Sequence, residues 1–206
     1  MKNEMTIRTV IFDLGRVLVP FDFHRGYRLM SERCGRAPEE VRERIKNLNI
    51  VHDFESGLID PVDFVARVTG DLGIKMSFDD FAEIWSYIFL PETLIPESLI
   101  EELKHRHRVV LLSNTNDIHY QMIERTYPIL RLFDDKVLSY RVKAMKPDPK
   151  IYAAAIEAAR CRPEECFFTD DVPEYVQAAR RMGIDAVVFE NAAQIRRELT
   201  LRGCLV

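Results

Sequence analysis

The stretch Thr9-Val10-Ile11-Phe12-Asp13-Leu14-Gly15 decides how the rest of this sequence is interpreted. Its first four residues are β-branched or apolar, which is typical of a strand buried on both faces of a parallel sheet. An aspartate follows directly, where that strand would end. In open α/β sheets the reactive groups lie at the carboxyl ends of the strands. The stretch therefore predicts a buried first strand that presents Asp13 as a candidate site residue.

Similar apolar segments recur along the chain and alternate with amphipathic stretches. The segments are Thr9–Phe12, Val109–Leu112, Lys136–Ser139, Cys166–Thr169 and Ala186–Phe189. The amphipathic stretches are Glu97–His107, Ile118–Tyr127, Ile151–Ala159, Glu174–Met182 and Ala193–Leu201. Strands that alternate with helices predict an α/β fold with a doubly wound parallel sheet, a Rossmann-like core.

The first two predicted strands are separated by residues 13–108, a stretch much longer than a crossover helix requires. Within it, apolar residues spaced by three and four predict helices at Gly26–Glu32, Pro38–Asn47, Asp60–Val68 and Phe78–Phe89. We therefore expect a small all-helical cap, residues 20–92, inserted into a core made of residues 1–19 and 93–206.

The composition restricts the class of protein. A chain of 206 residues holds one core with a modest insertion. The net charge of -4, without a basic stripe, predicts no nucleic-acid partner. No apolar run is long enough for a signal peptide or a membrane span, and the four cysteines form no C-x-x-C pair. We expect a cytoplasmic protein with reduced thiols and no membrane partner; no pattern indicates an oligomeric state.

Polar residues also follow two other predicted strands. Ser113-Asn114 comes after the second strand, and Asp170-Asp171 comes after the fourth. Lys146-Pro147-Asp148-Pro149 precedes a predicted helix that Pro149 favours as a start. These side chains would meet Asp13 at the carboxyl edge of the sheet.

The chemistry that fits this set is phosphoryl transfer to a carboxylate. An aspartate can attack phosphorus only when a metal ion and a cation offset the repulsion between the two anions. Asp170 and Asp171 offer hard oxygen ligands for Mg²⁺, and Asp13 would complete the site. Ser113 and the backbone amide of Asn114 can hold a phosphate oxygen, while Lys146 neutralises charge.

Four segments, in this order, resemble the motifs of the haloacid dehalogenase-like (HAD) hydrolase superfamily. They are Phe12-Asp13-Leu14-Gly15-Arg16-Val17, Leu112-Ser113-Asn114-Thr115-Asn116, Lys146-Pro147-Asp148-Pro149 and Phe168-Thr169-Asp170-Asp171. Within the superfamily, the sequences of these motifs are most similar to those of the bacterial branch of alpha-D-glucose-1-phosphate phosphatase-like proteins.

The resemblance implies a role for each residue. Asp13 would be the nucleophile and a magnesium ligand, the carbonyl of Gly15 a second ligand, and Asp171 the principal carboxylate ligand, supported by Asp170. The cap would close over the substrate. The implied activity is magnesium-dependent hydrolysis of a small phosphorylated metabolite, such as a sugar phosphate, through an aspartyl-phosphate.

Three positions depart from the family pattern. Most phosphatases of the superfamily have a second Asp where this chain has Gly15, so side-chain acid–base help is missing there. Asp22 and His24 are candidates to replace it. Arg16 stands where a small or amide residue is usual and could either bind phosphate or obstruct it. Tyr175 stands where many relatives have an acidic or amide residue near the metal.

Other interpretations of these residues stay open at this stage. The aspartates and Ser113–Asn116 could cap the helices that follow them, and Lys143 competes with Lys146 as the site cation. A metal-independent dehalogenase would use the same nucleophile but has no need of Asp170-Asp171. A phosphoester-binding protein without turnover would explain the three departures.

Overall fold

A five-stranded parallel sheet forms the centre of the protein. The computed structural model describes residues 6–205. The strands are β1 (Thr9–Phe12), β2 (Arg108–Ser113), β3 (Asp135–Leu138), β4 (Cys166–Asp170) and β5 (Asp185–Val188). Their order across the sheet is β3-β2-β1-β4-β5, and each neighbouring pair is parallel. The predicted doubly wound sheet is therefore confirmed, with β1 at its centre.

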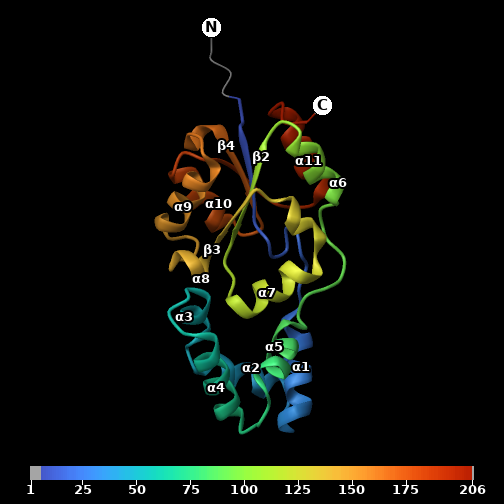
Figure 1. Cartoon of the computed structure of the whole chain (residues 1–206), viewed down its shortest axis with the longest axis vertical. Helices are drawn as coiled ribbons and strands as arrows, with labels where there is room; N and C mark the ends of the chain where they lie inside the picture. The colour runs from blue at the N-terminus through green and yellow to red at the C-terminus, as the bar shows by residue number, and fades with distance from the viewer. Residues whose placement is uncertain (1–5, 206) are drawn as a thin grey trace.

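Helices cover both faces of this sheet (Figure 1). On one face lie α6 (Glu97–Lys104), α7 (Asp117–Thr126) and α11 (Ala192–Leu201), and on the other lie α9 (Pro149–Ala159) and α10 (Pro173–Arg181). Successive side chains of β1 point to opposite faces of the sheet. Val10 and Phe12 pack against the helices of the first face, and Ile11 packs against those of the second. All three side chains are fully buried, which explains the continuous apolar run in the sequence.

The helices between β1 and α6 pack around a separate hydrophobic cluster. They are α1 (Phe23–Cys34), α2 (Pro38–Asn47), α3 (Val51–Glu55), α4 (Pro61–Leu72) and α5 (Phe78–Ser86). Phe54 stacks on Phe64 inside this cluster, with ring centroids 4.1 Å apart. Ile118, at the start of α7, is the member of the cluster that comes from the sheet-bearing part of the chain.

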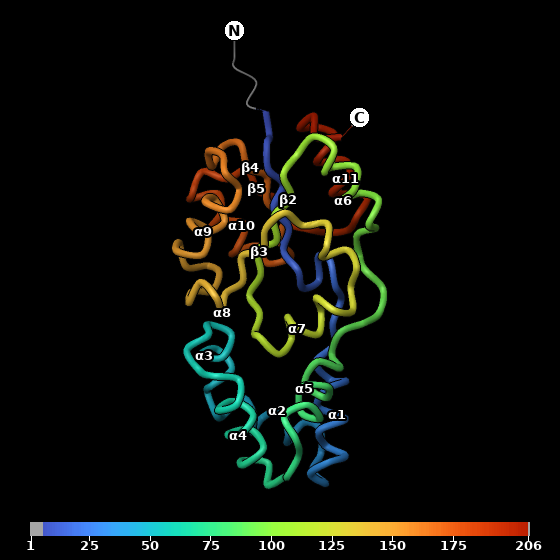
Figure 2. The backbone as a smooth tube through the Cα atoms, viewed as in Figure 1, coloured from blue at the N-terminus to red at the C-terminus, as the bar shows by residue number. Residues whose placement is uncertain are grey.

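Two chain segments connect these helices to the sheet and run side by side (Figure 2). They form an antiparallel bridge between Phe21 and Phe89. Backbone hydrogen bonds flank it, from Asp22 N to the Ile88 carbonyl at 2.8 Å and from Leu90 N to the Pro20 carbonyl at 2.9 Å. A short two-stranded connection thus joins the five helices to the carboxyl edge of the sheet, and contacts of α5 with α7 and of α3 with α8 (Ser139–Val142) add to it.

The predicted element boundaries differ from the observed ones by a few residues. Ser139, predicted as the end of a strand, instead begins the short helix α8 (Ser139–Val142). The 3₁₀ helices η1 (Pro128–Leu132) and η2 (Pro163–Glu165) and helix α3 had no predicted counterpart, because five residues or fewer carry no periodicity to recognise. Among residues 6–205, no helix has the length and apolar character needed to cross a membrane.

Candidate active site

Three carboxylates meet where β1 and β4 end. Asp13 follows β1, Asp170 ends β4 and Asp171 follows it. One ligand atom from each lies within 4.8 Å of the others. The sheet places them there because the connection from β1 to β2 carries α6 on one face and the connection from β3 to β4 carries α9 on the other, which opens a crevice at the carboxyl end of β1.

Lys146 lies among these carboxylates. Its Nζ is 2.6 Å from Oδ1 of Asp13 and 2.5 Å from Oδ2 of Asp170. The Lys146 side chain is only 2% exposed. Lys143, the competing cation of the sequence, is exposed and instead donates to the carbonyl of Gly57. The structure therefore brings Lys146, and not Lys143, to the carboxylates.

Asn114 fixes the backbone of Lys146. Its Nδ2 donates to the Lys146 carbonyl at 3.0 Å, and its Oδ1 accepts from the Lys146 amide at 2.8 Å. This paired contact joins the loop after β2 to the loop before α9. The ammonium group is consequently positioned from two elements that are far apart in the sequence.

The charges of this cluster do not balance. With all three carboxylates ionised and Lys146 protonated, these four side chains carry two surplus negative charges, which the nearby charge of exposed Arg16 offsets only in part. Burial raises the pKa of Asp13, the adjacent Lys146 opposes the rise and Asp170 adds to it. Burial alone would lower the pKa of Lys146, but the two carboxylates outweigh it and raise that pKa. A divalent cation held by hard oxygen ligands would offset the surplus, so this donor set fits Mg²⁺.

The loop after β2 lies against the same edge. Ser113 is 2% exposed, and among residues 6–205 its hydroxyl makes only a weak contact, 3.3 Å, to the carbonyl of Asn114. Thr115 N donates to Oγ of Ser139 at 2.9 Å, and Asn116 caps α7 by accepting from His119 N at 3.0 Å. The capping interpretation of this loop thus applies to Asn116, whereas the structure places the Ser113 side chain without a capping contact.

The aspartates after β4 do not cap α10. The residue at the start of that helix is Val172, and it makes no side-chain cap. Asp170 accepts from Val172 N through Oδ1 at 2.9 Å while its other oxygen contacts Lys146. Asp171 is half-buried. Its burial is the main cause that raises its pKa, and the nearby charge of Asp170 raises it further. Both carboxylate oxygens of Asp170 therefore have hydrogen-bond partners within the protein, whereas the carboxylate of Asp171 is the more accessible to solvent.

Phe21 occupies the space beside Gly15. A Cβ atom built on Gly15 would lie 2.8 Å from Cε1 of Phe21, closer than real Cβ contacts come. Arg16 has a positive φ of 58° and is exposed, and its guanidinium lies 4.9 Å from the centroid of the same Phe21 ring. The aromatic ring therefore stands where a side chain at position 15 would project.

The structure does not bring the two candidate acid–base residues to the carboxylates. Asp22 caps α1 by accepting from His24 N at 2.9 Å. Both side chains line a separate pocket with Arg25, Arg28 and Glu39. Tyr175 does reach the cluster, but through its ring: Lys146 Nζ lies 5.2 Å from the ring centroid.

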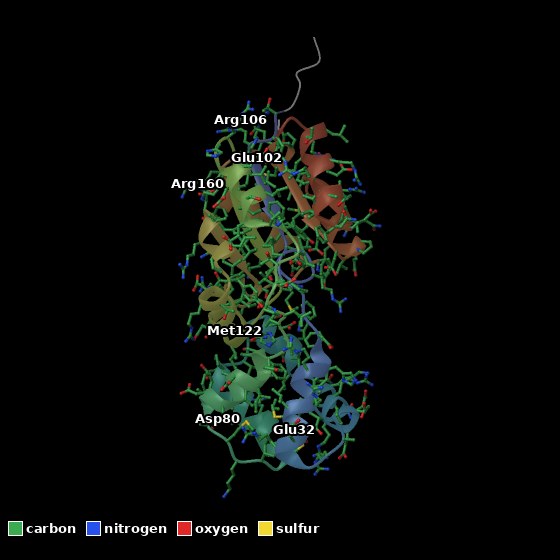
Figure 3. The ribbon with its side chains drawn as sticks, turned by 90° about the vertical axis from the view of Figure 1, so that its right-hand side faces the viewer. Glu32, Asp80, Glu102, Arg106, Met122 and Arg160 are labelled. Atoms are coloured by element: carbon green, nitrogen blue, oxygen red, sulfur yellow. The ribbon has the colours of Figure 1, made fainter. Side chains whose placement is uncertain are left out.

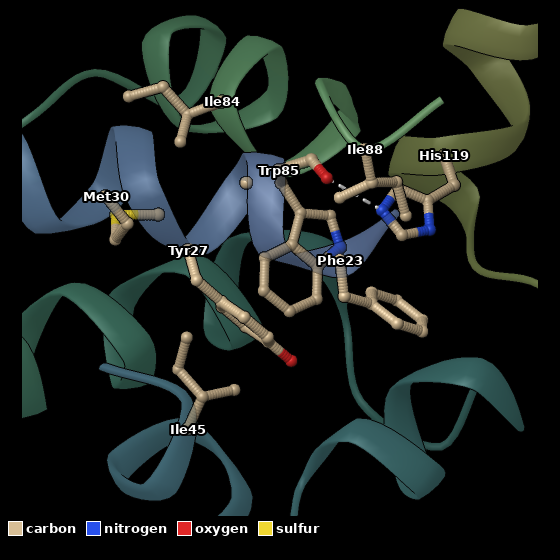
Figure 4. Close-up of a pocket in the computed structure, with 9 residues that line it drawn as sticks. Phe23, Tyr27, Met30, Ile45, Ile84, Trp85, Ile88 and His119 are labelled. Carbon is tan, nitrogen blue, oxygen red and sulfur yellow. Dashed lines mark hydrogen bonds between the residues drawn. The ribbon is translucent and has the colours of Figure 1, made fainter. Parts of the chain in front are cut away.

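His119 is a residue that the sequence pattern did not identify for this region. Its Nδ1 lies 3.0 Å from Nδ2 of Asn116. Its Nε2 lies 3.0 Å from the Trp85 carbonyl (Figure 4). Burial lowers its pKa to about 4, so the ring is neutral at pH 7. The amide of Asn116 then donates to Nδ1, and Nε2 donates to Trp85. His119 thus connects the loop after β2 with the end of α5.

An apolar pocket lies on the helical side of this connection (Figure 4). Its lining is mostly aromatic and aliphatic and comes from α1, α2, α5, the segment after α5, and α7: Phe23, Gly26, Tyr27, Met30, Ile45, Ile84, Trp85, Ile88 and His119. Phe23 also contacts Phe21, with ring centroids 5.0 Å apart. Through Phe21 and His119 the pocket borders both the loop after β1 and the loop after β2.

Comparison with known proteins agrees with this geometry. Residues 7–183 match the model of the haloacid dehalogenase-like hydrolases. The chain belongs to the HAD-like hydrolase family. It is 26% identical to a D-ribitol-5-phosphate phosphatase of Bacteroides thetaiotaomicron, over 95% of this chain and 98% of that protein. It is 25% identical to a phosphatase of Mycobacterium tuberculosis, over 98% of both chains.

Solved structures of this HAD-like family show the same fold. The magnesium complex of a HAD family enzyme from Bacteroides thetaiotaomicron is 29% identical, with a TM-score of 0.79 over 94% of this chain and 98% of that one. An L-2-haloacid dehalogenase is 17% identical, with a TM-score of 0.68 over 95% of this chain and 99% of that one. At that identity the second likeness concerns the fold alone.

Proposed function

We propose that this HAD-like chain is a magnesium-dependent phosphatase that hydrolyses a small phosphate monoester through an aspartyl-phosphate on Asp13. One observation carries the proposal: three converging carboxylates surround a single buried ammonium group and retain a surplus negative charge. A dehalogenase needs no metal site, so Asp170 and Asp171 favour phosphoryl transfer. The related enzyme crystallised with magnesium and inorganic phosphate supports the same chemistry.

In the proposed reaction Asp13 attacks the phosphorus atom in line with the leaving oxygen. Lys146 holds the nucleophile through its 2.6 Å contact and offsets charge on the phosphoryl group. Ser113 and the amide of Asn114 hold a phosphoryl oxygen. Asp13, Asp171 and the carbonyl of Gly15 would hold Mg²⁺, with Asp170 in support; the bound ion supplies charge neutralisation. Water then releases phosphate and restores Asp13.

The absence of an acid at position 15 shapes the proposed selectivity. Phe21 fills that space, and Asp22 and His24 lie elsewhere. General acid–base help of this kind contributes roughly 100 to 10,000-fold. We expect turnover to depend steeply on the leaving group, with aryl phosphates ahead of alkyl phosphates, because an aryl oxygen leaves without a proton.

The substrate class to test first is a phosphorylated sugar or sugar alcohol. The relative named as a D-ribitol-5-phosphate phosphatase supports this choice. Residues 20–92 would act as the cap that closes over such a substrate.

The test is phosphate release from p-nitrophenyl phosphate and a panel of sugar and sugar-alcohol phosphates, with Mg²⁺ and with EDTA. Asp13→Asn is the matched variant, since it removes the charge of the nucleophile and keeps its shape. We expect magnesium-dependent turnover that falls on the order of 10⁴-fold or more in the variant. Equal turnover by the variant would contradict the assignment of Asp13, and halide release without metal would support a dehalogenase.

A further inference from the structure

Two cysteines lie side by side at the amino end of β4, the end away from the carboxylates. Cys161 precedes η2, and Cys166 is the first residue of the strand. Their Sγ atoms are 3.5 Å apart, and both are free thiols. Since the sulfur atoms are already in contact, a small side-chain adjustment would bring them to bonding distance.

The two thiols differ in access. Cys166 is fully buried, whereas Cys161 is half-buried and lines a pocket of about 410 Å³. Burial raises the pKa of the Cys166 thiol, and the neighbouring Cys161 adds to the rise. Only Cys161 is therefore placed to meet a reagent from solvent, and Cys166 lies behind it.

The pocket at Cys161 is cationic. Four arginines line it: Arg8, Arg106, Arg108 and Arg160. Figure 3 shows Arg106 and Arg160 at the same end of the molecule, opposite Glu32 and Asp80. Arg108 contacts Asp135 at 3.3 Å and Arg8 contacts Glu165 at 3.9 Å. Within residues 6–205 neither Arg106 nor Arg160 makes an ion pair, so their charges remain available to an anion.

We propose that Cys161 and Cys166 form a thiol–disulfide pair that is oxidised by an anionic low-molecular-weight disulfide bound in this arginine-lined pocket. The Cys161 thiolate attacks one sulfur of the reagent, which forms a mixed disulfide and releases one thiol. Cys166 then gives its proton to the sulfur released from the reagent in the first step and attacks Sγ of Cys161, which forms the protein disulfide and releases the second sulfur as a thiolate that solvent protonates. Two protein thiols are oxidised and one disulfide is reduced to two thiols.

Hydrogen bonds at the pair are compatible with this order. The thiol of Cys161 donates to Oγ1 of Thr9 at 3.4 Å, and that of Cys166 donates to the Arg162 carbonyl at 3.5 Å. Once Cys161 is a thiolate, the Cys166 thiol can turn to donate to it across the 3.5 Å contact. The buried Cys166 reacts second, so the mixed disulfide at Cys161 forms before the protein disulfide.

The first experiment incubates the full chain with glutathione disulfide and follows its mass and its peptides with time. We expect glutathione on Cys161, followed by a Cys161–Cys166 disulfide. Cys166→Ser should stop at the mixed disulfide, and Cys161→Ser should prevent both products. Cys34→Ser and Cys204→Ser are the controls and should leave both products unchanged. First reaction at Cys34 or Cys204, or a mixed disulfide that never resolves in the unsubstituted chain, would overturn the proposal.

The second experiment tests the charge of the pocket. Arg106→Gln and Arg160→Gln should each slow the reaction with glutathione disulfide about threefold or more, and high salt should remove the difference. The reaction with uncharged hydroxyethyl disulfide should be unaffected. Arg131→Gln is the matched control, because Arg131 is exposed and lies outside the pocket. Equal slowing with both reagents, or slowing by Arg131→Gln, would show that the arginines do not select the anion.

Discussion

The two ends of strands β1 and β4 carry opposite kinds of charge in opposite surroundings. At the carboxyl end Asp13 and Asp170 are buried against Lys146, with residual exposure of 6% or less. At the amino end Thr9 lies beside Cys166 in register, and arginines stand exposed around them. Exposed cations need no partner, but buried carboxylates do. The contrast indicates that the carboxyl end requires a bound cation, whereas the arginines at the amino end are stable in solvent without a bound anion.

Among the variants that keep the nucleophile Asp13, the largest effect should follow from removing the buried ammonium group. Lys146→Met leaves Asp13 and Asp170 without their cation, so we expect kcat to fall on the order of 10²–10³-fold. In EDTA the free energy of unfolding should fall by about 3–5 kcal/mol. Urea unfolding and phosphate release measure the two effects.

Lys143→Met is the matched control, because Lys143 is exposed and contacts Gly57 instead of the carboxylates. It should change the free energy of unfolding by no more than about 0.5 kcal/mol and leave kcat unchanged. Similar losses of kcat and of unfolding free energy in Lys143→Met and Lys146→Met would contradict the claim that Lys146 is the cation of the site.

The next effect concerns the space beside Gly15. Gly15→Asp alone should fail to raise the rate, since the new side chain meets Phe21. Gly15→Asp combined with Phe21→Ala should raise kcat/KM on alkyl phosphates at least about tenfold, out of the ~100 to 10,000-fold that acid–base help provides. Aryl phosphates should gain less. A double variant that gains equally on both classes would show that protonation is not what position 15 lacks.

A smaller effect is expected at the accessible carboxylate. Asp171→Asn should raise the Mg²⁺ concentration needed for half-maximal rate by about tenfold or more, because a charged ligand becomes neutral. Saturating Mg²⁺ should restore most of the rate. Titration of activity with Mg²⁺ measures this, and an unchanged titration would remove Asp171 from the set of metal ligands.

The smallest effect should come from the amino end. Cys161 and Cys166 lie at the amino end of β4, away from Asp13 and Asp170 at the carboxyl ends of β1 and β4. The kcat of the oxidised protein should therefore stay within about twofold of that of the reduced protein. Turnover compared before and after oxidation, and again after reduction, measures this. A large reversible loss would show that the two ends of the strands are coupled.

Much of this arrangement could be predicted from the sequence because it depends on local patterns. The strand that leads to Asp13 is buried on both faces, so its apolar run was unambiguous. The carboxyl ends of parallel strands meet at one edge, which was enough to expect Asp13 near Asp170 and Asp171. The sheet, its all-parallel pairing and the membership of the HAD-like family followed from the same segments.

The rest depends on contacts between segments distant in the sequence. Nothing near Gly15 in the sequence shows that the Phe21 ring fills its side-chain space. His119 carried no pattern, because its role comes from the Trp85 carbonyl of α5 and from its burial. The cationic pocket was missed because Arg8, Arg106 and Arg160 are scattered along the chain and only the fold gathers them.

The central claim is that Asp13 carries the phosphoryl group, and borohydride trapping tests it most directly. Sodium borohydride reduces an acyl phosphate but leaves a free carboxylate intact, so quenching during turnover should convert Asp13 to homoserine. Peptide mass mapping should find this product only when substrate and Mg²⁺ are both present. An intact Asp13 in a sample that is releasing phosphate, or homoserine at another aspartate, would contradict the account.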